Sequence, residues 1–190
     1  MTDVWEQLAH YRKVKTLPNG DRLLLRPLSK NDKVGLVDLF ARASRKDLEY
    51  FRSDAGDPVV VKSWVDKLDF KRVFPLVAVV DDKIVGDATL HFAENYRRHR
   101  AWMRIFLDRE YRQQGIGTLM LRSLIEIGRR VAKHQLYAEV LTLQPQAIKA
   151  FEGLGFRTEV TLRDYFITDA GETLDVAIMV LWLVDRSGEF

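Results

Sequence analysis

The stretch DREYRQQGIGTLM, residues 108–120, constrains the fold of this chain more than any other part of the sequence. Gly115 and Gly117 stand one residue apart, between the apolar run WMRIFL and a helical pattern. A strand that passes through a glycine-rich turn into a helix points several backbone N–H groups in one direction, and the helix N-terminus adds a partial positive charge. Glycine has no Cβ to obstruct a ligand, and Arg112 and Thr118 add polar groups. The stretch therefore favours a phosphate or diphosphate ligand.

Two common phosphate-binding motifs do not fit this turn. A Walker A loop needs a lysine before its Ser or Thr, and no lysine stands there. A dinucleotide fingerprint needs a third glycine at position 120, which is Met120, and parallel strand–helix–strand units on both sides. Taken alone, the stretch leaves a plain turn without a ligand open as an alternative.

Hydrophobic periodicity and turn signals place this turn within a chain of mixed helices and strands. The strand before the turn and the strand after its helix should be parallel and joined by a right-handed crossover. The other strands form hairpins, so we expect a mixed α/β, mostly antiparallel fold. Helices are predicted at residues 3–14, within 29–44, and at 59–69, 117–134 and 145–154. Strands are predicted at residues 21–27, 74–80, 84–92, 101–107 and 136–143, and as two strands within 157–183. The core of the second helix is predicted to contain Val34, Leu36, Val37, Leu39 and Phe40.

The composition excludes several classes of protein. The chain has 190 residues, enough for one domain, and no cysteine, so it forms no disulfide. Its four histidines are scattered, and we predict no metal site. No apolar run approaches the roughly 20 residues of a membrane span, and residues 1–14 lack the apolar core of a signal peptide, so we expect a cytoplasmic protein. The net charge of +3 is too small to predict nucleic-acid binding, and the basic run at residues 96–100 is interpreted as a solvated loop.

Four segments in order resemble the GCN5-related N-acetyltransferase (GNAT) superfamily. The stretch LDREYRQQGIGTLML matches its pattern Arg/Gln-x-x-Gly-x-Gly/Ala. LLLRPLSKND, LYAEVLTLQPQAIKAFEGLGF and TLRDYFITDAGETLDVAIMVLWL are similar to its first strand, its late strand and helix, and its terminal hairpin. FRSDAGD also resembles a segment of bacterial protein-lysine acetyltransferases. The resemblance implies a mostly antiparallel sheet, splayed at one parallel strand pair and flanked by helices. We expect a helical extension at residues 1–16, an acetyltransferase domain at 17–185 and a tail at 186–190.

The resemblance implies acetyl-CoA as the co-substrate. Backbone amides of the glycine turn would hold its diphosphate, and its pantetheine would lie between the strands that end at Leu107 and Leu141. Lys149 is a candidate contact for a phosphate of the coenzyme, with a solvated face of its helix as the alternative interpretation. The complete expected coenzyme-binding set is Leu107, Arg112, Gln113, Gln114, Gly115, Ile116, Gly117, Thr118, Gln144, Lys149 and Phe151.

The implied reaction is direct attack of a primary amine on the thioester within a ternary complex. An amine of pKa near 10.4 is neutral in roughly one molecule per thousand at neutral pH, so a base must remove its proton. A positioned base contributes about 10² to 10⁴-fold. A backbone N–H near Leu107 would stabilise the oxyanion.

The sequence departs from the family at the acid–base positions. The glutamate base of many relatives falls on Trp102, the tyrosine acid on Phe151, and a family asparagine on Gln144. Glu94 and His91 are candidate substitutes for the base. A solvated loop charge and an ordinary strand residue are their alternative interpretations. Asp87 is a weaker candidate base, and Tyr165 is predicted to belong to the core rather than to replace the phenol.

Two functions stay open at this point. The first is an N-acetyltransferase whose acceptor is a small amine, a lysine or a protein N-terminus. The second is a non-catalytic module that binds acyl-CoA and regulates or contacts a partner. Neither needs a nucleic acid or a membrane, and both leave a homodimer open.

Overall fold

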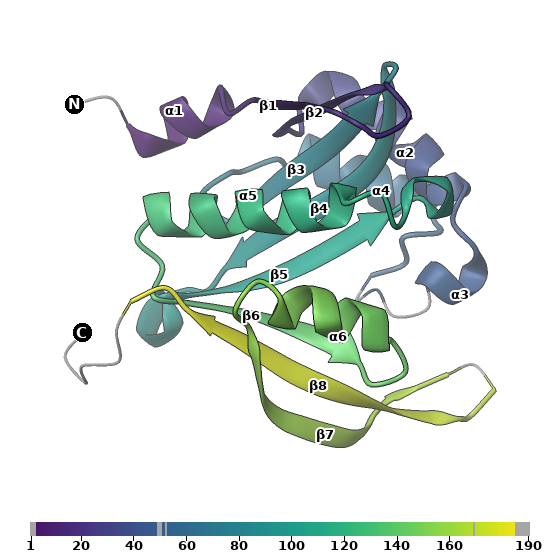
Figure 1. Cartoon of the computed structure of the whole chain (residues 1–190), viewed down its shortest axis with the longest axis vertical. Coiled ribbons are helices and arrows are strands. Elements are labelled where there is room, and N and C mark those ends of the chain that lie inside the picture. The colour runs from purple at the N-terminus through teal and green to yellow at the C-terminus, as the bar shows by residue number, and fades with distance from the viewer. Residues whose placement is uncertain (1–2, 49–50, 52, 169, 185–190) are drawn as a thin grey trace. The chain divides into compact units, whose positions relative to one another are not determined.

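The computed structural model describes residues 3–48, 51, 53–168 and 170–184 (Figure 1). The predicted tail at 186–190 lies outside the described residues, as does Arg52 of the segment FRSDAGD. The helices are α1 (Val4–Ala9), α2 (Lys33–Ala41), α3 (Arg45–Leu48), α4 (Pro58–Asp66), α5 (Ile116–Arg130) and α6 (Pro145–Glu152), with short 3-10 helices η1 (Lys30–Asp32), η2 (Asn95–Arg97) and η3 (Arg109–Tyr111). The strands are β1 (Lys13–Thr16), β2 (Arg22–Pro27), β3 (Val73–Val80), β4 (Lys83–Phe92), β5 (Arg100–Leu107), β6 (Gln135–Leu141), β7 (Arg157–Ile167) and β8 (Thr173–Trp182).

The fold is mixed α/β with an eight-stranded sheet in the order β1-β2-β3-β4-β5-β6-β8-β7. The pair β5–β6 is parallel, as the predicted crossover requires, and β1–β2, β2–β3, β6–β8 and β7–β8 are antiparallel. The chain divides into two compact units, residues 1–89 with 105–124, and residues 90–104 with 125–190. Strands β4 and β5 and helix α5 each contribute residues to both units. The predicted fold class is confirmed.

The first unit holds the helices that precede the sheet meander. Strands β3 and β4 are joined by a tight turn in which Asp81 and Asp82 both have positive φ, 47° and 61°, as a two-residue hairpin of the favoured twist requires. Figure 1 shows α2 and α4 on one face of β3 and β4. Phe40 of α2 is the centre of their shared core, since its ring lies 5.5 Å from Trp64 and 5.2 Å from Phe106.

The second unit is built around β6. Its parallel ladder with β5 runs from Arg100↔Gln135 to Trp102↔Tyr137, and its antiparallel ladder with β8 spans the whole strand. A Cβ at Gly128 of α5 would lie 3.1 Å from Leu136, so glycine lets this helix approach β6 closely. The hairpin of β7 and β8 forms the edge of this unit (Figure 1).

The structure corrects three details of the sequence-based prediction. Residues 13–16, within the expected helical extension, form strand β1, because their backbone groups pair with β2 from Lys13↔Leu25 to Thr16↔Arg22. Val34 is 71% exposed, since the buried face of α2 is Leu36, Leu39 and Phe40. Tyr165 is not a core residue but is 41% exposed, and its hydroxyl donates a 3.4 Å hydrogen bond to Glu139 Oε1. The domain boundaries themselves stay a prediction.

Candidate functional site

The glycine turn begins where β5 leaves the sheet, and its first residues are firmly anchored. The Asp108 amide donates to Val85 O at 2.9 Å, and its carboxylate accepts a hydrogen bond from Arg42 Nε at 2.8 Å. The other carboxylate oxygen accepts from the Glu110 amide at 3.3 Å, which caps η3. Arg42 also donates to Ile84 O. The path of the chain from β5 into the turn is therefore set by contacts within the first unit.

The backbone of the turn adopts conformations that most residues avoid. Gln113 and Gly115 have φ values of 63° and 78°, in the left-handed region that costs an L-residue about 1–2 kcal/mol. A Cβ at Gly115 would meet nothing within 4 Å, so this position opens to the outside of the turn. Glycine at 115 thus serves both the backbone conformation and access for a ligand.

Gly117 has a different environment from that of Gly115. A Cβ there would lie 3.7 Å from Ile105 and 4.0 Å from Leu107, which are ordinary packing distances. A side chain at this position would therefore point toward β5. Of the two glycines, Gly115 is the one whose added Cβ would meet open space, and the contact of Gly117 with the coenzyme stays a prediction.

Several backbone amides of the turn donate to no acceptor among the described residues. Within the described part of the chain, the backbone N–H groups of residues 113–118 donate to no acceptor, and the first one that does is Leu119, to Gly115 O at 3.1 Å. The last three of these amides are the first of α5, a helix of 15 residues whose N-terminus carries partial positive charge. The Ile116 side chain is 1% exposed, so this residue offers only its backbone. A diphosphate group fits such a cradle of free donors.

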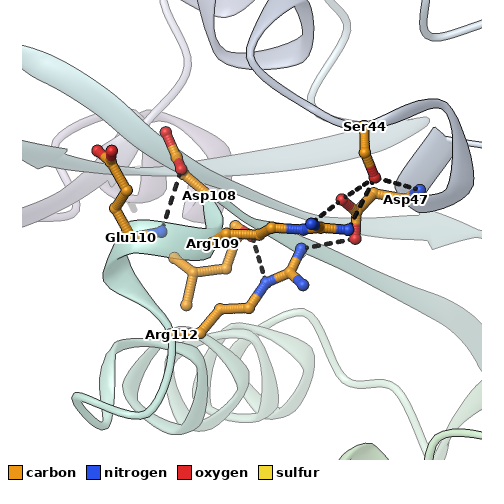
Figure 2. Close-up of polar contacts among 7 residues, drawn as sticks. Ser44, Asp47, Asp108, Arg109, Glu110 and Arg112 are labelled. Atoms are coloured by element: carbon orange, nitrogen blue, oxygen red, sulfur yellow. Dashed lines mark hydrogen bonds and ion pairs between the residues drawn. The ribbon is translucent and has the colours of Figure 1, made fainter.

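Arg112 is anchored by two hydrogen bonds. Its Nε donates to Leu107 O at 2.9 Å, and its Nη2 donates to Asp47 Oδ1 at 3.0 Å (Figure 2). The Leu107 carbonyl is thereby occupied from within the turn. Gln114 is also tied to the turn, because its side-chain amide donates to Glu110 O at 3.0 Å.

Asp47 of α3 and Ser44, the residue before this helix, contact the arginines of the turn, and neither was predicted from the sequence. The Asp47 carboxylate accepts hydrogen bonds from Arg112 and from Arg109 Nε, each at 3.0 Å. Ser44 Oγ donates to Asp47 Oδ2 at 2.5 Å and accepts from Arg109 Nη2 at 2.9 Å (Figure 2). The one available signal was the spacing Ser-x-x-Asp in SRKD, which is typical of a helix cap. The cap could be predicted from that spacing, but its arginine partners could not.

Asp47 keeps its negative charge at this place. Burial would by itself raise the pKa of Asp47, but the hydrogen bonds from Ser44 and Arg112 and the charges of Arg112 and Arg109 outweigh it, so the pKa lies below its ordinary value. The side chain is 14% exposed. The glycine turn therefore has two guanidinium groups beside it, bridged by one ionised carboxylate.

The other predicted coenzyme contacts belong to the second unit. Gln144 and Lys149 have exposed side chains at the two halves of α6, and the Gln144 carbonyl accepts from Ala147 and Ile148. Phe151 is 5% exposed, and its ring packs edge-on against Phe156 at 5.0 Å. Phe151 is thus a packing residue of α6 in addition to any contact with a ligand.

The candidate bases also lie in the second unit, apart from Asp87. His91, at the end of β4, lies against the Trp102 ring with centroids 4.7 Å apart. Glu94 is exposed and precedes η2. Asp87 is 3% exposed within β4 of the first unit. The structure brings His91 together with Trp102, the residue expected at the family's base position, and places Glu94 in the loop that follows.

The fold and the turn define a class: a mixed α/β protein with a turn of the phosphate-binding type at the start of its crossover helix. Residues 38–156 match the family model of the acetyltransferase (GNAT) family. The chain therefore belongs to this family, and the predicted family is confirmed. None of the helices in the described residues has the length and apolar character of a membrane span.

Known proteins agree with this assignment. The L-amino acid N-acetyltransferase AaaT of Escherichia coli K12 is 30% identical over 121 residues, which cover 61% of this chain and 73% of that protein. A GNAT acetyltransferase of Streptococcus pneumoniae superposes with a TM-score of 0.73 at 24% identity, covering 85% of this chain and 99% of the other. The protein yncA of Salmonella typhimurium, solved with acetyl-CoA, gives 0.75 at 19% identity, covering 88% and 98%. At these identities the solved structures support the fold alone.

Proposed function

We propose that this protein transfers an acetyl group from acetyl-CoA to a primary amine by direct attack in a ternary complex. The observation that carries the proposal is the row of backbone N–H groups at residues 113–118, which donate to no acceptor within the described residues and stand at the N-terminus of α5. The oxygens of a diphosphate bound there would accept hydrogen bonds from the unpaired N–H groups at the start of the helix. Its negative charge would also be stabilised by the positive end of the helix dipole. Membership of the GNAT family supports acyl transfer as the chemistry.

Each part of the coenzyme has a proposed partner in this chain. The amides of residues 113–118 would donate hydrogen bonds to its diphosphate oxygens, with Arg112 and Thr118 as flanking donors. Gln144, Lys149 and Phe151 stay predicted coenzyme contacts, and the first two are exposed. A backbone N–H near Leu107 would orient the thioester carbonyl. When bound, acetyl-CoA supplies the activated acetyl group, and the residues of the chain hold it and keep the amine in reach.

The proton of the attacking amine needs an acceptor, and His91 and Glu94 are the proposed candidates. Histidine titrates in the physiological range, and the Trp102 ring restricts where His91 can point. Glu94 is exposed, so it could also act through a water molecule. For the acceptor we favour small L-amino acids, because the relative AaaT is named for that activity, with peptides bearing a free N-terminus as the next class.

The coenzyme proposal is tested by thermal unfolding with and without acetyl-CoA. At a concentration of 100 times Kd, a ligand adds about 2.7 kcal/mol to the free energy of unfolding, which should raise Tm by about 5–10 °C for a chain of this length. Gly115→Glu should abolish the rise, because a side chain enters the open position and carries a negative charge.

Gly20→Glu is the matched control for Gly115→Glu. Gly20 also has positive φ, 93°, and an added Cβ there likewise meets nothing within 4 Å, but it lies in the turn before β2. Both variants should lose comparable stability without ligand, and only Gly20→Glu should keep the response to acetyl-CoA. An unchanged Tm of the wild-type protein at millimolar acetyl-CoA would refute the proposal.

The second candidate function is a non-catalytic acyl-CoA-binding module. It is favoured by two residues at the family's acid–base positions, Trp102 and the packed Phe151, neither of which can exchange a proton at neutral pH. Thiol release from acetyl-CoA, measured with a panel of L-amino acids, polyamines and peptides, separates the two functions. Turnover with any of these amines supports the enzyme, and binding of acetyl-CoA without turnover across the panel supports the module.

A further inference from the structure

We propose that Asp47 is a positioning residue of the coenzyme turn: with Ser44 it holds Arg112 and Arg109 so that their free N–H groups face the phosphates of the coenzyme. This inference rests on the proposed function and names a residue of α3 that the family pattern around the turn does not contain. Asp47 would not touch the coenzyme itself but would act through the two arginines.

The contacts form a closed set within the first unit. Arg112 Nη2 meets Asp47 Oδ1, and Arg109 Nε meets Asp47 Oδ2. Arg109 Nη2 meets Ser44 Oγ, which in turn donates to Asp47 Oδ2. The Asp47 amide donates back to Ser44 Oγ at 3.2 Å, so the short helix α3 orients the carboxylate from its own backbone. Figure 2 shows the arginine side chains extending from the turn to Asp47 and Ser44.

Arg112 keeps most of its hydrogen-bonding capacity in this arrangement. A guanidinium group has five N–H donors in a planar fork, and the contacts to Leu107 O and Asp47 use one donor each. The remaining donors, including both on Nη1, are available for a bidentate contact to a phosphate. Anchoring by two acceptors fixes the plane of the fork, and an arginine that is ordered beforehand loses less conformational entropy when the ligand binds.

The energetics of the cluster point to ligand positioning rather than to stability of the fold. Arg109 and Arg112 are 61% and 41% exposed, and ion pairs of exposed side chains contribute little to stability. Asp47 nevertheless contacts two arginines of the turn where a diphosphate is proposed to bind, and a lone carboxylate near that place would repel it. Because one carboxylate bridges two guanidinium groups, the cluster stays positive overall while the arginines stay ordered.

The first test compares coenzyme binding in the wild-type protein with that of Asp47→Ala, using calorimetry with acetyl-CoA. Loss of the orientation of both arginines should raise Kd about tenfold, the scale of one charge-assisted hydrogen bond. KM for acetyl-CoA should rise with it while kcat stays within about twofold, as expected for lost ground-state binding. Asp47→Glu, which keeps the charge, should restore part of the affinity.

A phosphate-free thioester provides an internal control. Acetyl-pantetheine lacks the diphosphate, so Asp47→Ala should leave its KM unchanged. Asp66→Ala is the matched control variant, because Asp66 of α4 also pairs with a basic side chain in the same unit, and its partner is Lys33 of α2 rather than a residue of the turn. It should bind acetyl-CoA as the wild type does. Equal weakening of the phosphate-free thioester in Asp47→Ala would overturn the inference.

A double-mutant cycle separates positioning from a structural role. Arg112→Gln is suitable because the family pattern accepts glutamine at this position, which keeps binding measurable. If Asp47 acts through the arginines, Asp47→Ala should weaken coenzyme binding much less in the Arg112→Gln background than in the wild type. An equal loss of coenzyme affinity in both backgrounds would overturn the positioning role of Asp47. Tighter coenzyme binding in the single variant Asp47→Ala would overturn it as well.

The outcome for the wild-type protein distinguishes the two proposals. If wild-type protein does not bind acetyl-CoA, the proposed function fails and this inference fails with it. If wild-type protein binds acetyl-CoA and Asp47→Ala binds equally well, only the role of Asp47 is refuted. The Tm of each variant without ligand, which should stay within a few degrees of the wild-type value, confirms that the variants are folded.

Discussion

Gly86, in the middle of β4, lies where the surrounding atoms leave no room for a side chain. A Cβ there would lie 2.9 Å from Leu107 Cδ1, 3.1 Å from Met120 Sδ and 3.2 Å from Phe106 O. The first two atoms belong to flexible side chains, but the third is backbone and cannot move away without shifting β5. Gly86 therefore packs β4 against the strand and helix that flank the glycine turn.

Gly86→Ala should destabilise the protein by about 1–3 kcal/mol, the usual cost of overpacking a buried site. Urea unfolding followed by circular dichroism measures the change in the free energy of unfolding. The comparison is Gly35→Ala in α2, whose Cβ would meet only the end of the Ile84 side chain at 3.2 Å. Alanine favours a helix over glycine by about 1 kcal/mol. This gain should offset the cost of shifting the Ile84 side chain, so Gly35→Ala should change the free energy of unfolding very little. Equal effects of the two substitutions would show that the space around Gly86 is not limiting.

At the scale of an element, the start of α2 depends on one carboxylate. Asp32 is 8% exposed and accepts two hydrogen bonds from Arg26, at 2.6 and 2.7 Å, and two from Ser29, through its amide and its hydroxyl. The pair Ser29 and Asp32 forms a capping box that joins η1 to β2. The structure gives this capping box a bidentate partner, Arg26.

Asp32→Ala should lower the free energy of unfolding by about 2–3 kcal/mol, since it removes a cap and charge-assisted hydrogen bonds and leaves Arg26 unpaired. The pH dependence provides a second readout. Burial would raise the pKa of Asp32, but the hydrogen bonds from Arg26 and Ser29 outweigh it, so the pKa lies below its ordinary value of 3.8. The stabilisation from Asp32 is therefore complete above pH 3.8 and is lost as the pH falls through the lower folded-state value.

Urea unfolding of the wild type and of Asp32→Ala at pH 7 and at pH values below 3.8 checks this prediction. The difference in stability between the two proteins should shrink as the pH falls in the acidic range. A difference that stays constant with pH would mean that the carboxylate charge of Asp32 does not contribute.

At the scale of the whole molecule, the proposed tasks are divided between the two units. The diphosphate turn belongs to the first unit, and the candidate bases His91 and Glu94 belong to the second. Substitutions in the two places should therefore have different kinetic signatures. Changes at the turn should appear in the affinity for acetyl-CoA, and changes at the base should appear in kcat.

His91→Gln and Glu94→Gln test this division, with an amine acceptor found in the panel as substrate. The variant that lacks the base should lose about 10² to 10⁴-fold in kcat, while its Kd for acetyl-CoA stays at the wild-type value. Calorimetry and steady-state kinetics measure the two quantities separately. Wild-type kcat in both variants would exclude both residues, and a raised Kd would assign them to coenzyme binding instead.

Much of this molecule follows from local sequence signals. The turn between β3 and β4, the capping box before α2 and the glycine turn before α5 each need particular residues at fixed spacing, because they depend on φ values and on contacts a few residues apart. The mixed fold class and its parallel pair followed from the order of these elements. Strand β1 was missed, since KVKT has little hydrophobic alternation and is a strand because β2 pairs with it.

By itself, the sequence determined where bare backbone lies between a strand and a helix, and hence where a phosphate-bearing coenzyme is proposed to bind. Only the tertiary structure decided which side chains surround that place. Asp47 and Arg112 are 65 residues apart in the chain. A local sequence pattern cannot predict which of the many charged side chains form an ion pair over such a separation. The reason is physical: backbone conformation is a local property, whereas an ion pair depends on the path of the whole chain that brings its two partners together.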